Sequence, residues 1–302
     1  MEKLIVILGP TAVGKTSVSL RVAEHFGLSV INADSRQIYA DLPIGTAAPT
    51  PAEQSRVKHH FVGTLHVTDY YSASKYETDV LHLLRNDPEF TNSRLALLSG
   101  GSMMYIDAVC NGIDDIPTIR DDVRAKMKQR YETEGLERLV EELRVVDPEH
   151  YAVVDRKNPR RVIHALEICY QTGRTYSSYR TNTNAPRWFD VVKIGLTRDR
   201  EELYERINAR VLQMIDDGFV EEALRVYPYR KENALNTVGY KEMFEYLDGL
   251  CTLDNAIVRI QGNTRKYCRK QLTWFKRDPH IHWHHPDDLD GIIHDIEEQV
   301  RV

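Results

Sequence analysis

Eight consecutive residues near the start of the chain carry the pattern of a phosphate-binding loop. Gly9-Pro10-Thr11-Ala12-Val13-Gly14-Lys15-Thr16 matches GxxxxGK followed by Ser or Thr, and it stands directly after the apolar run Leu4–Leu8. Glycines in such a P-loop let backbone N–H groups wrap an anion at a helix N-terminus, where the helix dipole also favours negative charge. We expect Lys15 to neutralise phosphate oxygens and the Thr16 hydroxyl to bind Mg²⁺. The motif therefore predicts a site for a phosphate chain, as in nucleotide-binding and ATP-binding proteins.

An acidic residue after the second predicted strand supplies a second reactive group. The strand predicted over Leu28–Ile31 leads to Asp34, whereas the strand predicted over Leu95–Leu98 leads to Ser99-Gly100-Gly101 and no acid. P-loop NTPases hold Mg²⁺ with a carboxylate that ends a neighbouring apolar strand. Asp34 is therefore a candidate Mg²⁺ partner in a small-molecule kinase, a candidate general base, or a cap of the next turn. The spacing alone leaves these interpretations open.

Strands that alternate with helices must position these groups. Helices are predicted over Ser17–Phe26 and Ser72–Arg85, and a further strand over Val191–Leu196. This alternation indicates βαβ units, and thus an α/β fold with a P-loop parallel sheet flanked by helices. Ligands of such sheets bind beyond the carboxyl ends of the strands. The P-loop, Asp34 and Gly100–Ser102 all fall at such ends, so we expect them to converge on one site.

The middle and the last third of the chain have a different pattern. From Asp121 to about Gln171 apolar residues recur at helical spacing, and residues 199–277 are also expected to be helical. We therefore predict a P-loop α/β core over residues 1–114 and 186–302 with a helical C-terminal part. Residues 115–185 are predicted to form a helical insertion domain.

Composition limits the classes of protein that fit. The 302 residues have ordinary apolar and charged fractions, which indicates a globular protein with one large or two moderate domains. No apolar run approaches the roughly 18 residues of a membrane span. Four scattered cysteines without a paired framework favour a reducing, cytoplasmic setting. Because the net charge is −5, any nucleic-acid site must be a local basic patch.

Several further motifs, taken in order, resemble the tRNA dimethylallyltransferase family, also called tRNA isopentenyltransferases. Besides the P-loop, the resemblance rests on Asp34-Ser35-Arg36-Gln37-Ile38-Tyr39, on Gly100-Gly101-Ser102 with Tyr105, on Pro159-Arg160-Arg161 and on Val238-Gly239-Tyr240. It covers nearly the whole chain. Most of these motifs are weak alone, but their combination in this order is highly specific. The resemblance implies transfer of a dimethylallyl group from dimethylallyl diphosphate to N6 of the adenine at position 37, next to the tRNA anticodon.

The resemblance also implies roles for single residues. It places Thr11 near the bridging oxygen of the diphosphate and Arg210 in contact with the diphosphate, with Arg206 one helical turn earlier as support. Asp34 is then the candidate base that accepts the proton of N6. The insertion is expected to bind the tRNA anticodon stem-loop, with the target base flipped out of its stack. Contacts with tRNA are implied for Asp34, Ser35, Arg36, Gln37, Ser102, Arg124, Arg160, Arg161, His164, Gly239 and Tyr240.

Two groups of residues have simpler interpretations. The basic residues between Arg265 and Arg277 are interleaved with aromatic residues, which suits RNA but also suits a plain amphipathic helix. His59-His60 and the four histidines between His280 and His285 suggest metal ligands. The second histidine group alternates like a short strand and lacks cysteine or carboxylate companions at ligand spacing. We therefore expect both histidine groups to be structural.

Three alternatives to the implied function remain. A P-loop kinase of a small metabolite would leave the insertion and the C-terminal third unexplained. An adenylate prenyltransferase would use a free nucleotide and need no tRNA contacts, and a nucleotide-gated RNA-binding module would catalyse nothing. The favoured interpretation requires tRNA and dimethylallyl diphosphate as substrates and Mg²⁺ as cofactor. It requires no membrane and no protein partner, and we expect a monomer.

Overall fold

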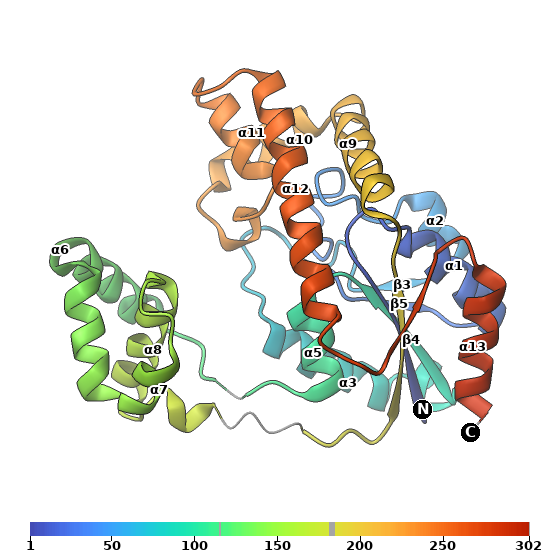
Figure 1. Ribbon diagram of the computed structural model, residues 1–302, viewed down its shortest axis with the longest axis horizontal. Coiled ribbons are helices and arrows are strands. Elements are labelled where there is room, and N and C mark those ends of the chain that lie inside the picture. The colour runs from blue at the N-terminus through green and yellow to red at the C-terminus, as the bar shows by residue number, and fades with distance from the viewer. Residues whose placement is uncertain (115, 181–184, 302) are drawn as a thin grey trace. The chain divides into compact units, whose positions relative to one another are not determined.

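The computed structural model describes residues 1–114, 116–180 and 185–301, and Figure 1 shows the course of the chain. The chain divides into two compact units. Met1–Asn111 and Pro186–Val302 form the first unit, and Gly112–Ala185 forms the second. The predicted start of the insertion at residue 115 lies outside the described residues. None of the helices in the described ranges is long and apolar enough to cross a membrane.

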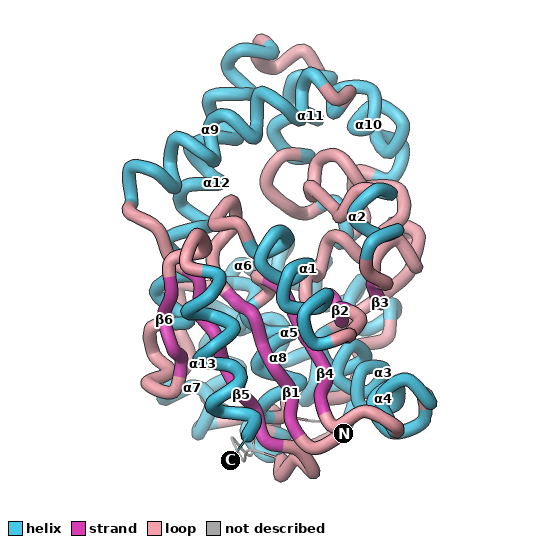
Figure 2. Tube along the Cα trace, turned by 90° about the vertical axis from the view of Figure 1, so that its right-hand side faces the viewer, coloured by secondary structure: helices cyan, strands magenta, loops and turns pink. Residues whose placement is uncertain are grey.

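A six-stranded sheet with all strands parallel forms the centre of the first unit, so the predicted fold class is confirmed. The strand order is β3-β2-β4-β1-β5-β6 (Figure 2). The strands are β1 (Lys3–Leu8), β2 (Val30–Asn32), β3 (His59–His60), β4 (Leu95–Gly100), β5 (Asp190–Leu196) and β6 (Ile281–His284). In the central strand β1, Leu8 lies opposite Gly100 of β4, so the loops that follow these two strands begin side by side.

Helices cover both faces of the sheet. Alternate side chains of the run Leu4–Leu8 pack on one face with α3 (Ala73–Asn86) and α5 (Met103–Asn111). The others pack on the opposite face with α1 (Lys15–Phe26) and α13 (Leu289–Arg301). Side chains alternate between the faces of a strand, so a strand that is covered on both sides must be apolar throughout. This requirement explains the continuous apolar run before the P-loop.

The C-terminal helices form a further layer beyond the carboxyl edge of the sheet (Figure 2). They surround a separate apolar cluster that contains Phe219, Tyr240 and Ile260. The helices are α9 (Arg200–Asp216), α10 (Phe219–Val226), α11 (Tyr240–Leu247) and α12 (Leu253–Phe275), which confirms the predicted helical C-terminal part. Short helices α2 (Pro51–Arg56) and α4 (Pro88–Thr91) and the 3₁₀ turns Tyr227–Tyr229 and Asn233–Leu235 complete the first unit. α12 reaches all three apolar clusters of this unit through Ile260, Cys268 and Phe275.

The second unit consists of α6 (Asp121–Val146), α7 (Pro148–Val153), α8 (Pro159–Thr172) and the 3₁₀ turn Ser177–Tyr179. Its own core includes Leu139, Leu143 and Leu166. α6 is broken at Gly135, whose φ of 78° is one that side-chain-bearing residues rarely adopt. Helices were predicted for this region, but the break was not. It lets α6 turn back, so that Arg130 pairs with both Glu134 and Glu142.

A buried arginine anchors the segment with which the chain re-enters the first unit. The Arg187 side chain is 9% exposed, and its guanidinium pairs with Glu77 and donates to the carbonyl oxygens of Ala108 and Val109. Removing one partner of a buried ion pair leaves an uncompensated charge in the interior. This contact therefore holds the start of β5 against α3 and α5.

We expect Arg187→Met to lower the free energy of unfolding by about 3–5 kcal/mol, because the Glu77 carboxylate then loses its partner. Equilibrium urea unfolding measures this loss, and the Glu77→Gln/Arg187→Met double variant should recover part of it. Arg94→Met is the matched control, because Arg94 pairs with Glu2 at the surface and should cost less than about 1 kcal/mol. A loss for Arg187→Met no larger than that of the control would contradict the assignment.

Candidate active site

The P-loop connects β1 to α1 in a backbone conformation that depends on particular residues. A Cβ at Gly9 would lie 2.7 Å from the carbonyl oxygen of Leu196, so only glycine fits there. Gly14, with φ of 112°, precedes the first turn of α1. Ala12 also has a positive φ of 65°, a conformation that persists in a non-glycine residue only when the surroundings hold it.

Two arginines supply that support, Arg198 from the segment between β5 and α9, and Arg206 from within α9. Arg206 donates from Nε to the carbonyl oxygen of Ala12, and Arg198 donates from Nε to the carbonyl oxygen of Val13. Arg198 in turn pairs with Glu202 and Asp287. Arg206, which was predicted to play a supporting role, therefore contacts the back of the loop, where the carbonyl oxygens lie.

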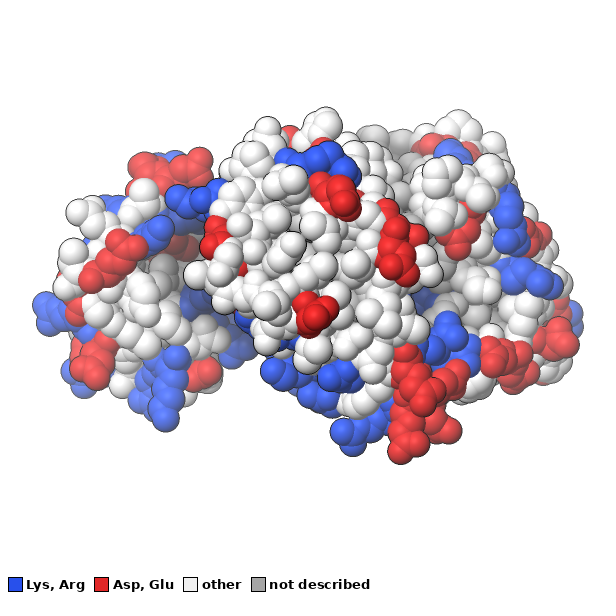
Figure 3. Space-filling view, turned by 90° about the horizontal axis from the view of Figure 1, so that it is seen from above, with Lys and Arg blue, Asp and Glu red and all other residues white. Residues whose placement is uncertain are grey.

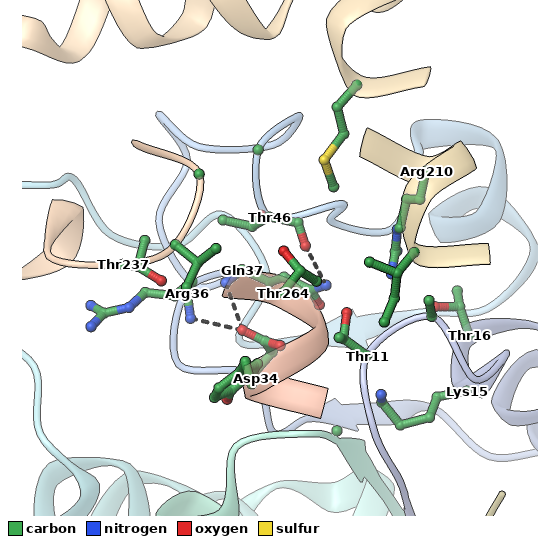
Figure 4. Close-up of a pocket in the computed structure, with 18 of the residues that line it drawn as sticks. Thr11, Lys15, Thr16, Asp34, Arg36, Gln37, Thr46, Arg210, Thr237 and Thr264 are labelled. Carbon is green, nitrogen blue, oxygen red and sulfur yellow. Dashed lines mark hydrogen bonds between the residues drawn. The ribbon is translucent and has the colours of Figure 1, made fainter. Parts of the chain in front are cut away.

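A cavity of about 950 Å³ lies beside the loop, and all of its lining residues belong to the first unit. Figure 4 shows the side chains of Thr11, Lys15, Asp34 and Arg210 directed into it from three different segments. The predicted site residues that line the cavity are Thr11, Ala12, Gly14, Lys15, Thr16, Asp34, Ser35, Arg36, Gln37, Arg210 and Gly239. The expected convergence of the P-loop with Asp34 is thus present.

Two desolvated cations share one carboxylate in this cavity. Burial lowers the pKa of Lys15 to about 8; the Asp34 carboxylate opposes this shift, and the Arg210 guanidinium adds to it. Burial likewise lowers the pKa of Arg210, again opposed by Asp34 and reinforced by Arg206. The Lys15 ammonium donates to the carbonyl oxygens of Gly9 and Pro10 at 3.0 and 2.8 Å, contacts that do not neutralise its charge. Taking charges out of water is unfavourable without counter-charge, so the cavity is suited to an anion.

Asp34 lies just beyond the carboxyl end of β2, in a turn that it caps itself. Its Oδ1 accepts hydrogen bonds from the backbone N–H groups of Arg36 at 2.9 Å and Gln37 at 3.4 Å. The turn is tied to the end of β4, because Ser35 N–H donates to Ser102 Oγ at 2.8 Å. The capping interpretation of Asp34 therefore holds for one carboxylate oxygen, while the carboxylate still lines the cavity.

Three residues predicted to contact tRNA are already engaged within the protein. The Gln37 amide donates to the carbonyl oxygens of Thr46 and Ala47, and Ser102 is buried under the Asp34 turn. Tyr240 is fully buried, and its hydroxyl donates to Glu222. The Tyr240 side chain thus offers RNA no surface in this structure. It belongs to the core because its ring packs against Phe219.

Sequence reasoning missed the residue that organises this wall of the cavity. Glu222, which is completely buried in α10, accepts hydrogen bonds from the N–H groups of Ile44 and Gly45 at 2.8 and 2.7 Å. It also accepts the hydrogen bond from Tyr240. A carboxylate with three donors is stabilised in a buried position. In the sequence Glu222 is one of two adjacent glutamates in a helix, and nothing there distinguishes it from a solvated charge.

Four of the predicted RNA contacts lie in the second unit. Arg124 on α6 and Arg160 and Arg161 on α8 are exposed, and His164 on α8 lies beside Tyr176 and Glu167. On the face seen in Figure 3, acidic and basic side chains are interspersed and no field of one sign covers it. This face therefore carries no global basic field.

The two ambiguous groups of the sequence also have defined surroundings. On α12, Arg265 donates to Asn208 and Arg269 to the Tyr204 hydroxyl, which ties part of the basic face to α9. His282 and His284 of β6 both approach the Asp295 carboxylate of α13. The expected short strand of histidines is thus present, although a carboxylate companion comes from a later helix.

The Lys15 pKa sets a pH dependence for anion binding. Inorganic diphosphate binds the ammonium form of Lys15 and raises the pKa of that group. The contribution of Lys15 to diphosphate affinity is therefore complete below pH 8 and is lost as the pH rises above about 8. Isothermal titration between pH 6.5 and 9.5 measures this, and Lys15→Ala should weaken binding throughout. Lys15→Arg is the control, because its guanidinium stays charged over the whole range. This variant should lack the part of the fall in affinity that deprotonation of Lys15 causes. The same profile in the wild-type protein and in Lys15→Arg would contradict the assignment.

Comparisons with known proteins agree with this geometry. A family model described as IPP transferase matches residues 37–278. The protein named tRNA dimethylallyltransferase 1 of Phocaeicola vulgatus is 61% identical over 292 residues, which are 97% of each chain. A crystal structure of the full-length tRNA isopentenylpyrophosphate transferase of Bacillus halodurans is similar with a TM-score of 0.70 and 33% identity, covering 100% of this chain and 99% of that one.

A structure of a eukaryotic dimethylallyltransferase acting on tRNA is also similar, with a TM-score of 0.77 and 26% identity over 91% of this chain and 70% of that one. The family match begins after the P-loop and Asp34, but the relative from Phocaeicola vulgatus covers nearly the whole chain. The family predicted from the motifs is thereby confirmed. This chain belongs to the IPP transferase family, and it is a close relative of proteins named tRNA dimethylallyltransferase.

Proposed function

We propose that this protein transfers a dimethylallyl group from dimethylallyl diphosphate to N6 of adenosine 37, next to the anticodon of tRNA, and releases diphosphate. One observation carries the proposal: an anion-binding P-loop, two buried cations and the Asp34 carboxylate line the same cavity. The names of the relatives support it, because they are tRNA dimethylallyltransferases and one solved relative acts on tRNA.

The donor half of the site suits a departing diphosphate. As the bond between the allylic carbon and oxygen weakens, the carbon gains cationic character and negative charge grows on the diphosphate. Donors and charges that are fixed beforehand where charge develops stabilise that transition state. Lys15, Arg210 and the N–H groups at the start of α1 are such groups, and the Thr11 hydroxyl faces the same cavity, where it would meet the bridging oxygen.

The acceptor half of the site suits an amine that must lose a proton. The N6 amino group of adenine is a poor nucleophile, and its proton leaves as the new carbon–nitrogen bond forms. All hydrogen bonds found for Asp34 in the described part of the chain go to Oδ1, so Oδ2 is left to accept that proton. The carboxylate is held by its own turn, which keeps it aimed while the base enters.

The cavity has room and lining for both substrates. At about 950 Å³ it is at the upper end of the range for small-ligand sites, roughly 300–1,000 Å³. Its apolar lining includes Ile207, Val211 and Met214 on α9 together with Phe219 and Ile260, which suits a five-carbon isoprenoid tail. The remaining predicted contacts, Arg124, Arg160 and Arg161 among them, would hold the RNA backbone without reading its sequence.

Mg²⁺ fits this site as a partner of the diphosphate. Thr16 lines the cavity next to Lys15, and β4 ends in Ser99 and Gly100, where NTPases have an acid. Mg²⁺ keeps several waters and is commonly held by few protein oxygens together with phosphate oxygens. The Thr16 hydroxyl would be the protein ligand of the ion. The ion would offset part of the negative charge that develops on the leaving diphosphate.

The mass of the product separates the proposal from its alternatives. The protein is incubated with dimethylallyl diphosphate, Mg²⁺ and unmodified tRNA, and the tRNA is then cleaved to oligonucleotides that are sequenced by mass spectrometry. In parallel incubations AMP, or ATP with small metabolites, replaces the tRNA. An adenosine that has gained one C5H8 unit at position 37 supports the proposal. The same gain on free AMP alone indicates an adenylate prenyltransferase, and a phosphorylated metabolite formed from ATP indicates a kinase.

We expect Asp34→Ala to lower the single-turnover rate by roughly 10²–10⁴, the range for loss of a general base, with tRNA binding largely kept. Asp34→Asn is the sharper variant, because its side-chain oxygen can still accept from Arg36 and Gln37 and keep the turn. Rapid-quench assays give the rate and filter binding gives the tRNA affinity. An unchanged rate in Asp34→Asn would exclude the role of base.

A further inference from the structure

A buried amide on α12 lies between the two halves of the site. Gln271 is 2% exposed, and its Oε1 accepts the backbone N–H of Thr11 at 2.9 Å. Its Nε2 donates to the carbonyl oxygen of Gly101 at 2.8 Å. The side chain thus bridges the P-loop after β1 to the loop after β4, across 260 and 170 positions of sequence.

The bridge is closely fitted at its second end. A Cβ at Gly101 would lie 2.6 Å from the Gln271 amide nitrogen and 3.4 Å from the Lys15 ammonium. The amide can therefore reach the Gly101 carbonyl only because that residue lacks a side chain. Both ends of the amide are used, which is what a buried polar group requires.

The contact with Thr11 orients this residue. Backbone N–H groups of a P-loop ordinarily face the anion, but the N–H of Thr11 faces Gln271. With its backbone fixed in this way, Thr11 contributes its hydroxyl to the cavity (Figure 4). Because of this hydrogen bond, Thr11 presents its hydroxyl, and not its N–H group, to dimethylallyl diphosphate.

The contact of Gln271 with Gly101 connects Thr11 to the acceptor half of the site, which contains Asp34. Gly101 is followed by Ser102, whose hydroxyl accepts the N–H of Ser35, the neighbour of Asp34. Gly100 touches the other end of this turn, because a Cβ there would lie 2.1 Å from the Ala33 carbonyl oxygen. Thr11 and Asp34 are thus both connected to the segment Gly100–Ser102, and Gln271 makes the connection for Thr11.

We propose that Gln271 is a positioning residue of the transfer reaction, which orients the Thr11 hydroxyl and fixes its place relative to Asp34. The inference rests on the proposed function. It predicts an effect on the chemical step larger than the effect on donor binding, because Lys15, Arg210 and the other N–H groups of the loop are untouched. It also predicts that the effect of Gln271 depends on the Thr11 hydroxyl.

The main experiment is a double-mutant cycle between Gln271→Met and Thr11→Ala, measured as single-turnover transfer to tRNA. Methionine keeps the length and approximate volume of the side chain and loses both hydrogen bonds. We expect the rate of Gln271→Met to fall roughly 10–100-fold, as for a small misplacement of a reacting group. The donor dissociation constant should change less than about threefold, and the double variant should match Thr11→Ala within about twofold. Multiplicative effects of the two substitutions would overturn the proposal.

Gln261→Met is the matched control. It removes a side-chain amide from the same helix, but the hydrogen bond lost there goes to the Asn208 carbonyl of α9. We expect transfer to be unchanged in this variant. A loss equal to that of Gln271→Met would show that α12 matters only as a helix, and would overturn the role of Gln271. If Gln271→Met does not fold, Gly101→Ala displaces the amide from the other side and should give the same interaction with Thr11→Ala.

A second readout does not depend on transfer. Amide hydrogen exchange followed by NMR should show faster exchange at Thr11 in Gln271→Met, with no change at Thr11 in Gln261→Met. Unchanged exchange at Thr11 would overturn the contact itself, even if transfer proceeds. A wild-type protein that shows protected Thr11 but no transfer would instead overturn the proposed function, and with it the catalytic part of this inference.

Discussion

The site depends on the burial of two cations, Lys15 and Arg210, beside the Asp34 carboxylate, which lies just beyond the carboxyl end of β2. Desolvation disfavours both charges, as the lowered pKa of each shows. An anion that binds here compensates the two positive charges, and it is bound most strongly when its own negative charge is greatest. A diphosphate that is leaving an allylic carbon is such an anion, so the same constraint accounts for binding and for stabilisation of the transition state.

The rest of the first unit can be understood as the support of this arrangement. The P-loop has a non-glycine residue, Ala12, in a left-handed conformation, and hydrogen bonds from outside the loop hold it. Arg206 of α9 and Arg198, just before α9, donate to carbonyl oxygens of the loop, and Gln271 of α12 accepts from the Thr11 N–H group. The helices beyond the sheet therefore close the cavity and also fix the geometry of the loop that the sheet presents.

Much of this organisation could be predicted from the sequence where its cause is local. The apolar run before the P-loop predicts a buried strand because a strand covered on both faces has no polar side, and β1 has that environment. The convergence of Asp34 with the P-loop follows from parallel strands, whose carboxyl ends meet at one edge. Arg210 was assigned from the resemblance, and its place one turn after Arg206 brings it to the same cavity.

Features that arise from contacts between distant segments could not be predicted. Gln271 and Glu222 acquire their roles from backbone groups 170 or more positions away, and no local pattern marks either residue. Tyr240 belongs to a motif that was interpreted as an RNA contact, but the surrounding apolar cluster buries it completely. The two-residue strand β3 is too short to show periodicity.

The break of α6 at Gly135, in contrast, has a cause that is visible in the sequence, since glycine is the residue that adopts such a backbone conformation.

The most direct test of the central claim is a crystal structure with a stable analogue of dimethylallyl diphosphate. The account predicts that the diphosphate lies against the N–H groups at the start of α1 and contacts the Lys15 ammonium and the Arg210 guanidinium, with the allylic carbon directed toward Asp34. A diphosphate bound elsewhere, or an allylic carbon directed away from the Asp34 carboxylate, would contradict it.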